Sequence, residues 1–237
     1  MKNYRHALVI GASSGIGAEL VKQLLASGTR VAAVARRGDR LRELGEGVLP
    51  FEHDVTNYEE VPDLFMEITK QLGGLDLIIY AAGVMPEVGP SEYSFEKDKQ
   101  MIEVNLLGAM AWLDQAAIRF ENTGHGSIVG IGSVAGDRGR AGQPVYNTSK
   151  AALATYLEAL RNRLSAKGVN VVTIKPGPTA TEMTAHLHMK MSDPKDVARF
   201  ILKNADHTGE HYVKLTHRIA FAIIRAVPSP IFRRLKL

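Results

Sequence analysis

Short apolar runs alternate with longer segments of helical spacing along most of this 237-residue chain. The runs are nearly continuous in apolar residues, as expected of strands that are covered on both faces. Strands that alternate with helices form a parallel sheet with right-handed crossovers, so we expect one doubly wound α/β domain over residues 1–237. The expected strands are Ala7–Ile10, Val31–Ala35, Leu49–His53, Leu77–Ala81, Ile128–Ile131 and Val171–Ile174. The expected helices are Ile16–Leu25, Val61–Leu72, Phe95–Phe120 and Val145–Leu164.

A glycine-rich turn connects the first strand to the first helix, with the spacing Gly-x-x-x-Gly-x-Gly. Glycines allow a backbone to approach a pyrophosphate, and a helix N-terminus offers free N–H groups and positive potential. Glycines also occur in turns for backbone reasons alone. In this strand–turn–helix setting the motif predicts a dinucleotide site. Its expected contacts are Gly11, Ser13, Ser14, Gly15, Ile16 and Gly17.

Two arginines, Arg36 and Arg37, follow the second expected strand. NAD-binding turns usually carry an acidic residue there for the ribose hydroxyls, whereas guanidinium groups suit a 2′-phosphate. The pair therefore favours NADP, with Ser13 as a further hydrogen-bonding group. The alternative is two solvated arginines at a strand end.

Tyr146 and Lys150 lie four residues apart in an expected helix, so they share one face. A neighbouring ammonium favours the phenolate and is expected to lower the tyrosine pKa. Ser133 supplies a second hydroxyl that can hold a carbonyl oxygen. With the dinucleotide site, the three residues predict hydride transfer to or from a carbonyl carbon. Alone, a Tyr-x-x-x-Lys spacing is common, and its simpler interpretation is a packed ring beside a solvated lysine.

From Ala7 to Thr181 these motifs resemble the short-chain dehydrogenase/reductase family. The resemblance implies a Rossmann fold with strand order 3-2-1-4-5-6-7. It implies that Ser133 orients the substrate, Tyr146 is the acid or base, and Lys150 binds the nicotinamide ribose. Asn105 would hold a water that bridges to the lysine. Further implied cofactor contacts are Asp54 and Val55 at the adenine, Ala82 and Gly83 at the ribose, and Pro176, Gly177, Thr179 and Thr181 at the carboxamide.

The resemblance also implies a homodimer or homotetramer and an NADP-dependent enzyme. The expected substrates are ketones, aldehydes or secondary alcohols, with hydroxy acids and 3-oxoacyl compounds among them. A non-catalytic NADP-binding sensor or interaction module is the alternative. The family's Asn-Asn-Ala-Gly is replaced here by Tyr80-Ala81-Ala82-Gly83. The C-terminus also departs from the fatty-acid ketoreductase branch.

The net charge of +4 arises in the C-terminal segment, where residues 212–237 contain no acidic residue. We therefore expect no nucleic-acid partner. The chain has no cysteine and shows no signal peptide, which favours the cytoplasm. His186-x-His188 and His207-x-x-x-His211 lack a third ligand at metal spacing, so no metal is expected. Some of the residues His186, His188, Met183 and Met189 are expected to line the substrate pocket.

The basic and apolar tail, residues 214–237, contains a helical pattern over His217–Val227 that ends at Pro228. We expect Ile219, Ile223 and Ile224 to pack on the body or on a neighbouring subunit. Contact with a membrane surface is the alternative, because the flanking residues are basic.

Overall fold

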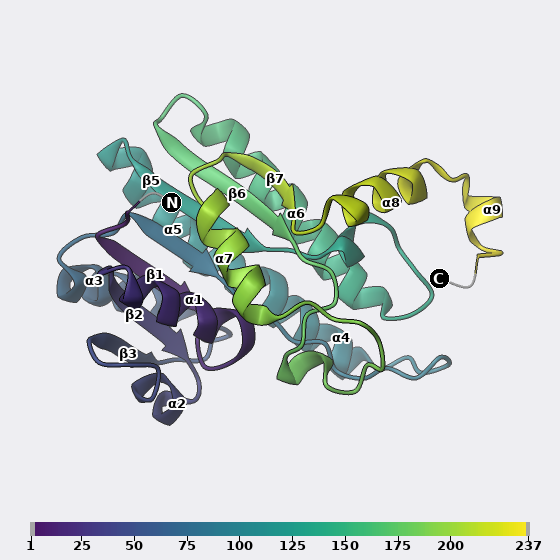
Figure 1. Ribbon diagram of the computed structural model, residues 1–237, viewed down its shortest axis with the longest axis horizontal. Coiled ribbons are helices and arrows are strands. Elements are labelled where there is room, and N and C mark those ends of the chain that lie inside the picture. The colour runs from purple at the N-terminus through teal and green to yellow at the C-terminus, as the bar shows by residue number, and fades with distance from the viewer. Residues whose placement is uncertain (1–2, 236–237) are drawn as a thin grey trace.

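The structure, a computed structural model, describes residues 3–235 and contains a seven-stranded parallel sheet. The strand order is β3-β2-β1-β4-β5-β6-β7, which confirms the predicted fold and order (Figure 1). The strands are β1 (His6–Ile10), β2 (Arg30–Ala35), β3 (Val48–Glu52), β4 (Leu77–Tyr80), β5 (Gly126–Ile131), β6 (Val169–Lys175) and β7 (Gly209–Tyr212). Six of these match the expected runs to within a few residues. The hydrophobic pattern did not reveal β7, which only the family's strand order implied.

Alternate residues of each central strand face opposite helical layers. In β1, Leu8 and Ile10 pack in the core on one face, and Ala7 and Val9 in the core on the other. Each of these side chains is fully buried. The first face is covered by α3 (Val61–Leu72), α5 (Gly108–Thr123) and α6 (Pro144–Leu164). The second is covered by α1 (Gly15–Ala26), α2 (Gly38–Arg42) and α7 (Pro194–Asn204).

The prediction of a single helix over Phe95–Phe120 is wrong, because a π-helical turn interrupts it. The chain forms α4 (Phe95–Ile102), a π-helical turn at Glu103–Leu107, and then α5. A π turn adds a residue to the helical repeat, so it changes which side chains face the core. The phenol of Tyr80 donates a 2.6 Å hydrogen bond to the Val104 carbonyl in this turn. Tyr80, which replaces a family asparagine, thus supports the turn that carries Asn105.

A buried network of charges joins the last two strands to the short helix Val134–Asp137. The Lys175 ammonium lies 2.5 Å from the Asp137 carboxylate and 2.7 Å from that of Glu210. The Tyr212 phenol donates to the other Asp137 oxygen at 2.8 Å. Burial and this bond to a carboxylate raise the pKa of Tyr212. Because such a pair is costly to break once it is buried, the network fixes the loop after Ser133 against β6 and β7.

The tail forms α8 (Leu215–Ala226) and α9 (Ser229–Phe232), which extend away from the sheet in Figure 1. Arg138 holds them, since its guanidinium donates to the Arg225 carbonyl and stacks 4.6 Å from the centre of the Phe232 ring. Ile219 and Ile223 are 54% and 62% exposed, so their expected packing on the body is wrong, while packing on a neighbouring subunit stays a prediction. Ile224 is partly buried, as expected.

Within residues 3–235, no helix is both long enough and apolar enough to cross a membrane. Trp112 is fully buried in the core, and its ring meets that of His53 edge to face at 5.5 Å.

Candidate active site

A cavity of about 1040 Å³ opens at the carboxyl ends of the central strands. This edge of a doubly wound sheet is where such folds usually bind ligands. Of the residues that the sequence assigned to the site, all but Asn105 line this cavity. The structure therefore brings together the glycine-rich turn, the two arginines, the Ser133 and Tyr146 hydroxyls, and the segment from Pro176 to Thr181.

The glycine-rich turn has no room for side chains at two positions. Gly11 adopts φ +85°, and a Cβ there would lie 2.4 Å from the Ala82 nitrogen. A Cβ on Gly17 would lie 2.1 Å from the Gly11 carbonyl oxygen. Ser14, the N-cap of α1, makes no side-chain cap, and no acidic residue lies in the first turn. The first N–H groups of α1 therefore remain available to an anionic group.

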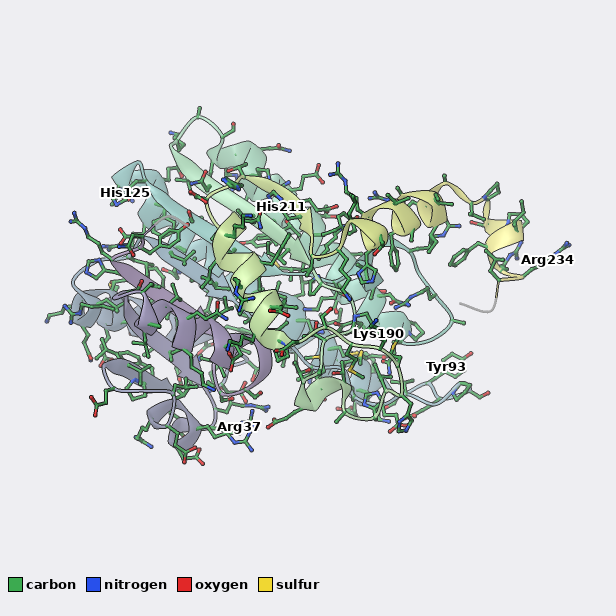
Figure 2. The ribbon with its side chains drawn as sticks, viewed as in Figure 1. Arg37, Tyr93, His125, Lys190, His211 and Arg234 are labelled. Carbon is green, nitrogen blue, oxygen red and sulfur yellow. The ribbon has the colours of Figure 1, made fainter. Side chains whose placement is uncertain are left out.

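Arg37 is held at the edge of the cavity by three neighbours. Its Nη2 donates to Ser13 Oγ at 3.0 Å and to Ser14 Oγ at 2.9 Å. Its Nη1 donates to Glu182 at 2.8 Å, and Arg40 donates to the second oxygen of the same carboxylate. Hydrogen bonds from Arg37 and then Arg40 lower the pKa of Glu182. In Figure 2 the Arg37 side chain points toward the short helix that contains Glu182.

Arg36 and Asp54 form the second charged pair of this edge, with 3.7 Å between Nη1 and Oδ2. Asp54 Oδ1 accepts hydrogen bonds from the Thr56 N–H at 3.0 Å and from its hydroxyl at 2.8 Å. Burial opposes ionisation of Asp54, yet these bonds and Arg36 bring its pKa below the usual value. Three arginines and two carboxylates thus surround this end of the cavity. The sequence analysis did not assign Arg40 or Glu182 to the site.

Asn105 lies behind the cavity wall and is fully buried. Its Oδ1 accepts from the Val84 N–H at 2.7 Å, and its Nδ2 donates to the Val84 carbonyl at 3.0 Å. Nδ2 also donates to Ser149 Oγ at 3.1 Å. Asn105 therefore connects the strand-end loop after Gly83 to the helix that carries Tyr146 and Lys150.

The Lys150 ammonium is buried and donates to the Ile131 carbonyl at 2.9 Å. Its Nζ lies 5.8 Å from the centre of the Tyr146 ring. Within the described chain it forms no ion pair. Burial lowers the pKa of Lys150 to about 8.

Tyr146 differs from the sequence expectation in its pKa. Burial raises this pKa, while a hydrogen bond with Ser133 and the positive charge of Arg140 oppose the rise. The positive charge that lowers it is that of Arg140, while the Lys150 ammonium donates to the Ile131 carbonyl. The expected low tyrosine pKa is therefore wrong, because burial outweighs the groups that lower it. Tyr146 keeps its proton at neutral pH.

The sequence analysis missed several residues of the cavity. Arg140 and Gln143 lie between Ser133 and Tyr146, and His217 and Phe221 of α8 form another part of the wall. The charged segment Asp137-Arg138-Gly139-Arg140 was the available signal in the sequence. It lies between Ser133 and Tyr146, the two hydroxyl residues assigned to the site. His186, Met183 and Met189 line the cavity, as expected for some of this group, and His188 does not. Among residues 3–235 no group of three His, Cys, Asp or Glu side chains is placed to hold a metal.

A family model described as short chain dehydrogenase matches residues 5–192. The chain belongs to the short-chain dehydrogenase family. It is an oxidoreductase of that family, as the names of its relatives also indicate. The glycine-rich turn, Ser133, Tyr146 and Lys150 all fall within the matched range of this short-chain dehydrogenase.

Two relatives and one solved structure illustrate the likeness. An uncharacterized oxidoreductase of Myxococcus xanthus is 34% identical over 237 residues, covering 96% of this chain and 91% of its own. One of Mycobacterium tuberculosis is 34% identical over 188 residues, covering 75% and 74%. A short-chain dehydrogenase of Burkholderia cenocepacia, solved in complex with NADP, superposes with a TM-score of 0.87 at 25% identity, covering 99% and 98%.

Replacing Lys150 with Met tests the burial of its charge. Below pH 8 the folded protein holds this proton less tightly than the unfolded chain, whose lysine has a pKa near 10.5. We expect the variant to be more stable than the parent at pH 7, by roughly 3 kcal/mol. The difference should shrink as the pH rises from 8 to 10.5, because the unfolded lysine then loses its proton as well. Urea unfolding of both proteins over this range measures it, and a difference independent of pH would contradict the lowered pKa.

Proposed function

We propose that this short-chain dehydrogenase is an NADP(H)-dependent oxidoreductase that transfers a hydride between the nicotinamide and a ketone, aldehyde or secondary alcohol. One observation carries the proposal. The cavity has the free N-terminus of α1 on one side and the Ser133 and Tyr146 hydroxyls, with the Lys150 ammonium beneath, on the other. This arrangement provides both a dinucleotide cradle and a proton donor.

The residues of the cavity fit NADP. The turn excludes a Cβ at Gly11 and Gly17, which leaves backbone exposed to a pyrophosphate. Arg37, Arg36 and Ser13 would hold the 2′-phosphate, with Asp54 and Val55 near the adenine. The NADP complex of the Burkholderia relative supports this choice. Cofactor contacts are also proposed for Ser14, Gly15, Ile16, Ala82, Gly83, Pro176, Gly177, Thr179 and Thr181.

Tyr146 would act as the proton donor in carbonyl reduction. When bound, the cofactor supplies the hydride. Tyr146 is protonated at neutral pH because burial raises its pKa, so its hydroxyl can give a proton to the carbonyl oxygen. Ser133, whose Oγ accepts from the Ala135 N–H at 3.0 Å, would donate its own hydrogen to the developing oxyanion.

Lys150 and Asn105 would support the proton donor. With a pKa near 8, Lys150 is mostly protonated at neutral pH and favours the phenolate that remains after transfer. Asn105 would fix Ser149 and the loop after Gly83, which sets the position of the helix under Tyr146. Assembly into a homodimer or homotetramer is also proposed, and the 57% exposed Ile118 on α5 supports a contact at that helix.

Replacing Tyr146 with Phe separates this enzyme from a non-catalytic NADP-binding module. We expect NADPH-dependent reduction of a carbonyl panel to fall at least about a hundredfold, because general acid catalysis typically contributes that much. The NADPH dissociation constant should stay within about twofold, since the ring remains. Tyr156→Phe is the matched control, because its phenol bonds to Asp114 outside the cavity. Equal activity of the Tyr146 variant and the parent, or no turnover by the parent, would refute the proposal.

Replacing Arg37 with Ala tests cofactor choice. Loss of a charge-assisted hydrogen bond to the 2′-phosphate should weaken NADPH binding by about tenfold to a hundredfold and leave NADH within about twofold. Glu182→Gln is the complementary variant, because it releases Arg37 and Arg40 from a competing carboxylate and should strengthen NADPH binding. Fluorescence titrations of the parent and the two variants with both cofactors measure the six dissociation constants. An unchanged ratio of NADPH to NADH affinity in the Ala variant would remove Arg37 from the phosphate site.

A further inference from the structure

Arg140 is a cation on the substrate side of the cavity without a carboxylate partner. Within the described chain it forms no ion pair, and its side chain has one hydrogen bond, from Nη2 to Asn147 Oδ1 at 3.3 Å. Its Nε is buried and has no partner. A partly buried guanidinium whose buried Nε–H has no acceptor is costly, because this group has lost water without gaining an equivalent bond. An anionic ligand at this position would remove that cost.

The position of Arg140 relative to the other charges points the same way. The carboxylates among the cavity-lining residues are Asp54 and Glu182, and both are engaged by the arginines at the cofactor edge. The loop that follows Arg140 adds neutral residues to the wall, since Gln143 lines the cavity and donates to the carbonyl of Pro86, which also lines it. Arg140 lines the same cavity as Tyr146, and its guanidinium donates to Asn147, the residue next to the proposed proton donor. A ligand bound to Arg140 therefore has its reacting carbon near Tyr146 only if the anion and the carbonyl are separated by a few bonds.

Asn147 keeps the guanidinium in place without neutralising it. Its Nδ2 donates to the Gly142 carbonyl at 3.1 Å and to the Arg140 carbonyl at 3.4 Å, which orients Oδ1 toward Arg140. Gln143, the one non-glycine residue with positive φ in the described chain, turns this loop into α6 at φ 57°. Its Nε2 donates to the Pro86 carbonyl at 3.2 Å, while its Oε1 is buried without a partner.

We propose that Arg140 binds an anionic group, a carboxylate or a phosphate, of the carbonyl substrate. This inference rests on the proposed function and narrows it to oxo acids or their phosphate analogues. Arginine suits the task because its planar donors can hold two oxygens at once. The same contact would place the carbonyl oxygen between Ser133 and Tyr146.

The test compares benzoylformate with its methyl ester, which lacks the charge, in the parent and in Arg140→Met. We expect the parent to favour the acid in kcat/KM. In the variant the KM for the acid should rise at least about tenfold, the loss of one charge-assisted contact. The KM for the ester should change by less than about threefold. The KM of Arg140→Lys for the acid should lie between that of the parent and that of Arg140→Met. A slower kcat shared by both substrates is expected, because Arg140 also acts on Tyr146.

Equal KM changes for acid and ester would overturn the role of Arg140 while leaving the proposed function intact. If the parent reduces neither compound, calorimetric titration of the NADP complex with benzoylformate still tests the inference, since only the parent should bind it. Benzoate and phenyl phosphate as competing ligands then distinguish a carboxylate from a phosphate site. Equal calorimetric binding by the parent and Arg140→Met overturns it.

A second inference concerns the outer face of the tail helices. Leu215, Ala222 and Ala226 share one face of α8 with Ile219 and Ile223, and all are exposed. Leu215 is 68% exposed on α8, and Ile231 is 55% exposed on α9. The opposite face, with His217, Phe221 and Ile224, is turned to the body and is partly buried. The outer face is thus a large apolar surface, which soluble proteins normally cover.

The charges around this outer face have one sign. Lys214, Arg218, Arg225, Arg233 and Arg234 are all exposed, and residues 213–235 contain no carboxylate side chain. In Figure 2 Arg234 extends outward from the end of the tail. A twofold pairing of two copies through this face would bring identical basic residues together, which disfavours it. An apolar face flanked by arginines and lysines matches the acyl boundary and the negative headgroups of an anionic bilayer.

We infer that the outer face of α8 and α9 docks on an anionic lipid surface. Arg138 would keep the two helices in the docking position through its bonds to the Arg225 carbonyl and to Ser229 Oγ. Because His217 and Phe221 of the same helix line the cavity, docking would bring the substrate pocket close to the bilayer.

Co-sedimentation of the full chain with vesicles tests this docking. Vesicles of phosphatidylcholine with 30% phosphatidylglycerol, a composition of about the anionic content that attracts basic segments, should bind the parent. Pure phosphatidylcholine should bind it at least about tenfold less, and 0.5 M salt should weaken the anionic binding. The double variant Ile219→Ser, Ile223→Ser should lose most binding and keep its melting temperature, whereas replacing the 61% exposed Met66 of α3 with Ser should leave vesicle binding unchanged. Equal binding by the double variant and the parent, or a parent that stays in solution, overturns the inference. A double variant that dissociates from an oligomer without vesicles would assign the face to a second copy instead.

Discussion

The contact between the first turns of α6 and the end of β5 sets the geometry of the whole site. There the buried Lys150 ammonium donates to the Ile131 carbonyl and lies beneath the Tyr146 ring. A charge placed in this position has little water and no carboxylate to offset it, so its position must be held by the packing of the helix on the sheet. The same packing places Tyr146 beside Ser133. The chemistry proposed for the cavity depends on this one contact.

The loop between Ser133 and Tyr146 connects that contact to the rest of the molecule. Asp137 is held by Lys175 and Tyr212 in a buried network, while Arg138 holds the tail helices and Arg140 faces the cavity. Three charged residues within four positions therefore act on three different parts of the fold. The tail thus meets the cavity at two places, since α8 contributes His217 to the wall and is bonded to the loop that carries Arg140.

The sequence predicted the sheet, most helices and the composition of the cavity, because these depend on local patterns. Apolar runs such as Ala7–Ile10 indicate a buried strand without any knowledge of the rest of the fold. The spacing of the glycine-rich turn likewise indicates close backbone approach from local sequence alone. The helix α7 was also readable, since Asp193 caps it and Pro194 opens it, but it was overlooked. The π turn at Glu103–Leu107 could not be predicted from the sequence, because it is supported by Tyr80 from a distant part of the chain. The raised pKa of Tyr146 could not be predicted either, because it depends on how deeply the phenol is buried. The exposed face of α8 was equally hidden, since periodicity gives the two faces of a helix without saying which one meets the body.

The most direct test of the account follows the hydride itself. NADPH deuterated at the transferable position of its nicotinamide is incubated with the protein and an aromatic aldehyde, and the alcohol is examined by mass spectrometry and proton NMR. The account predicts an alcohol that carries one deuterium on its carbinol carbon, on a single prochiral face, since the cavity fixes the cofactor on one side of the carbonyl. An alcohol with no deuterium on its carbinol carbon, or equal labelling of both faces, would contradict hydride transfer within this site.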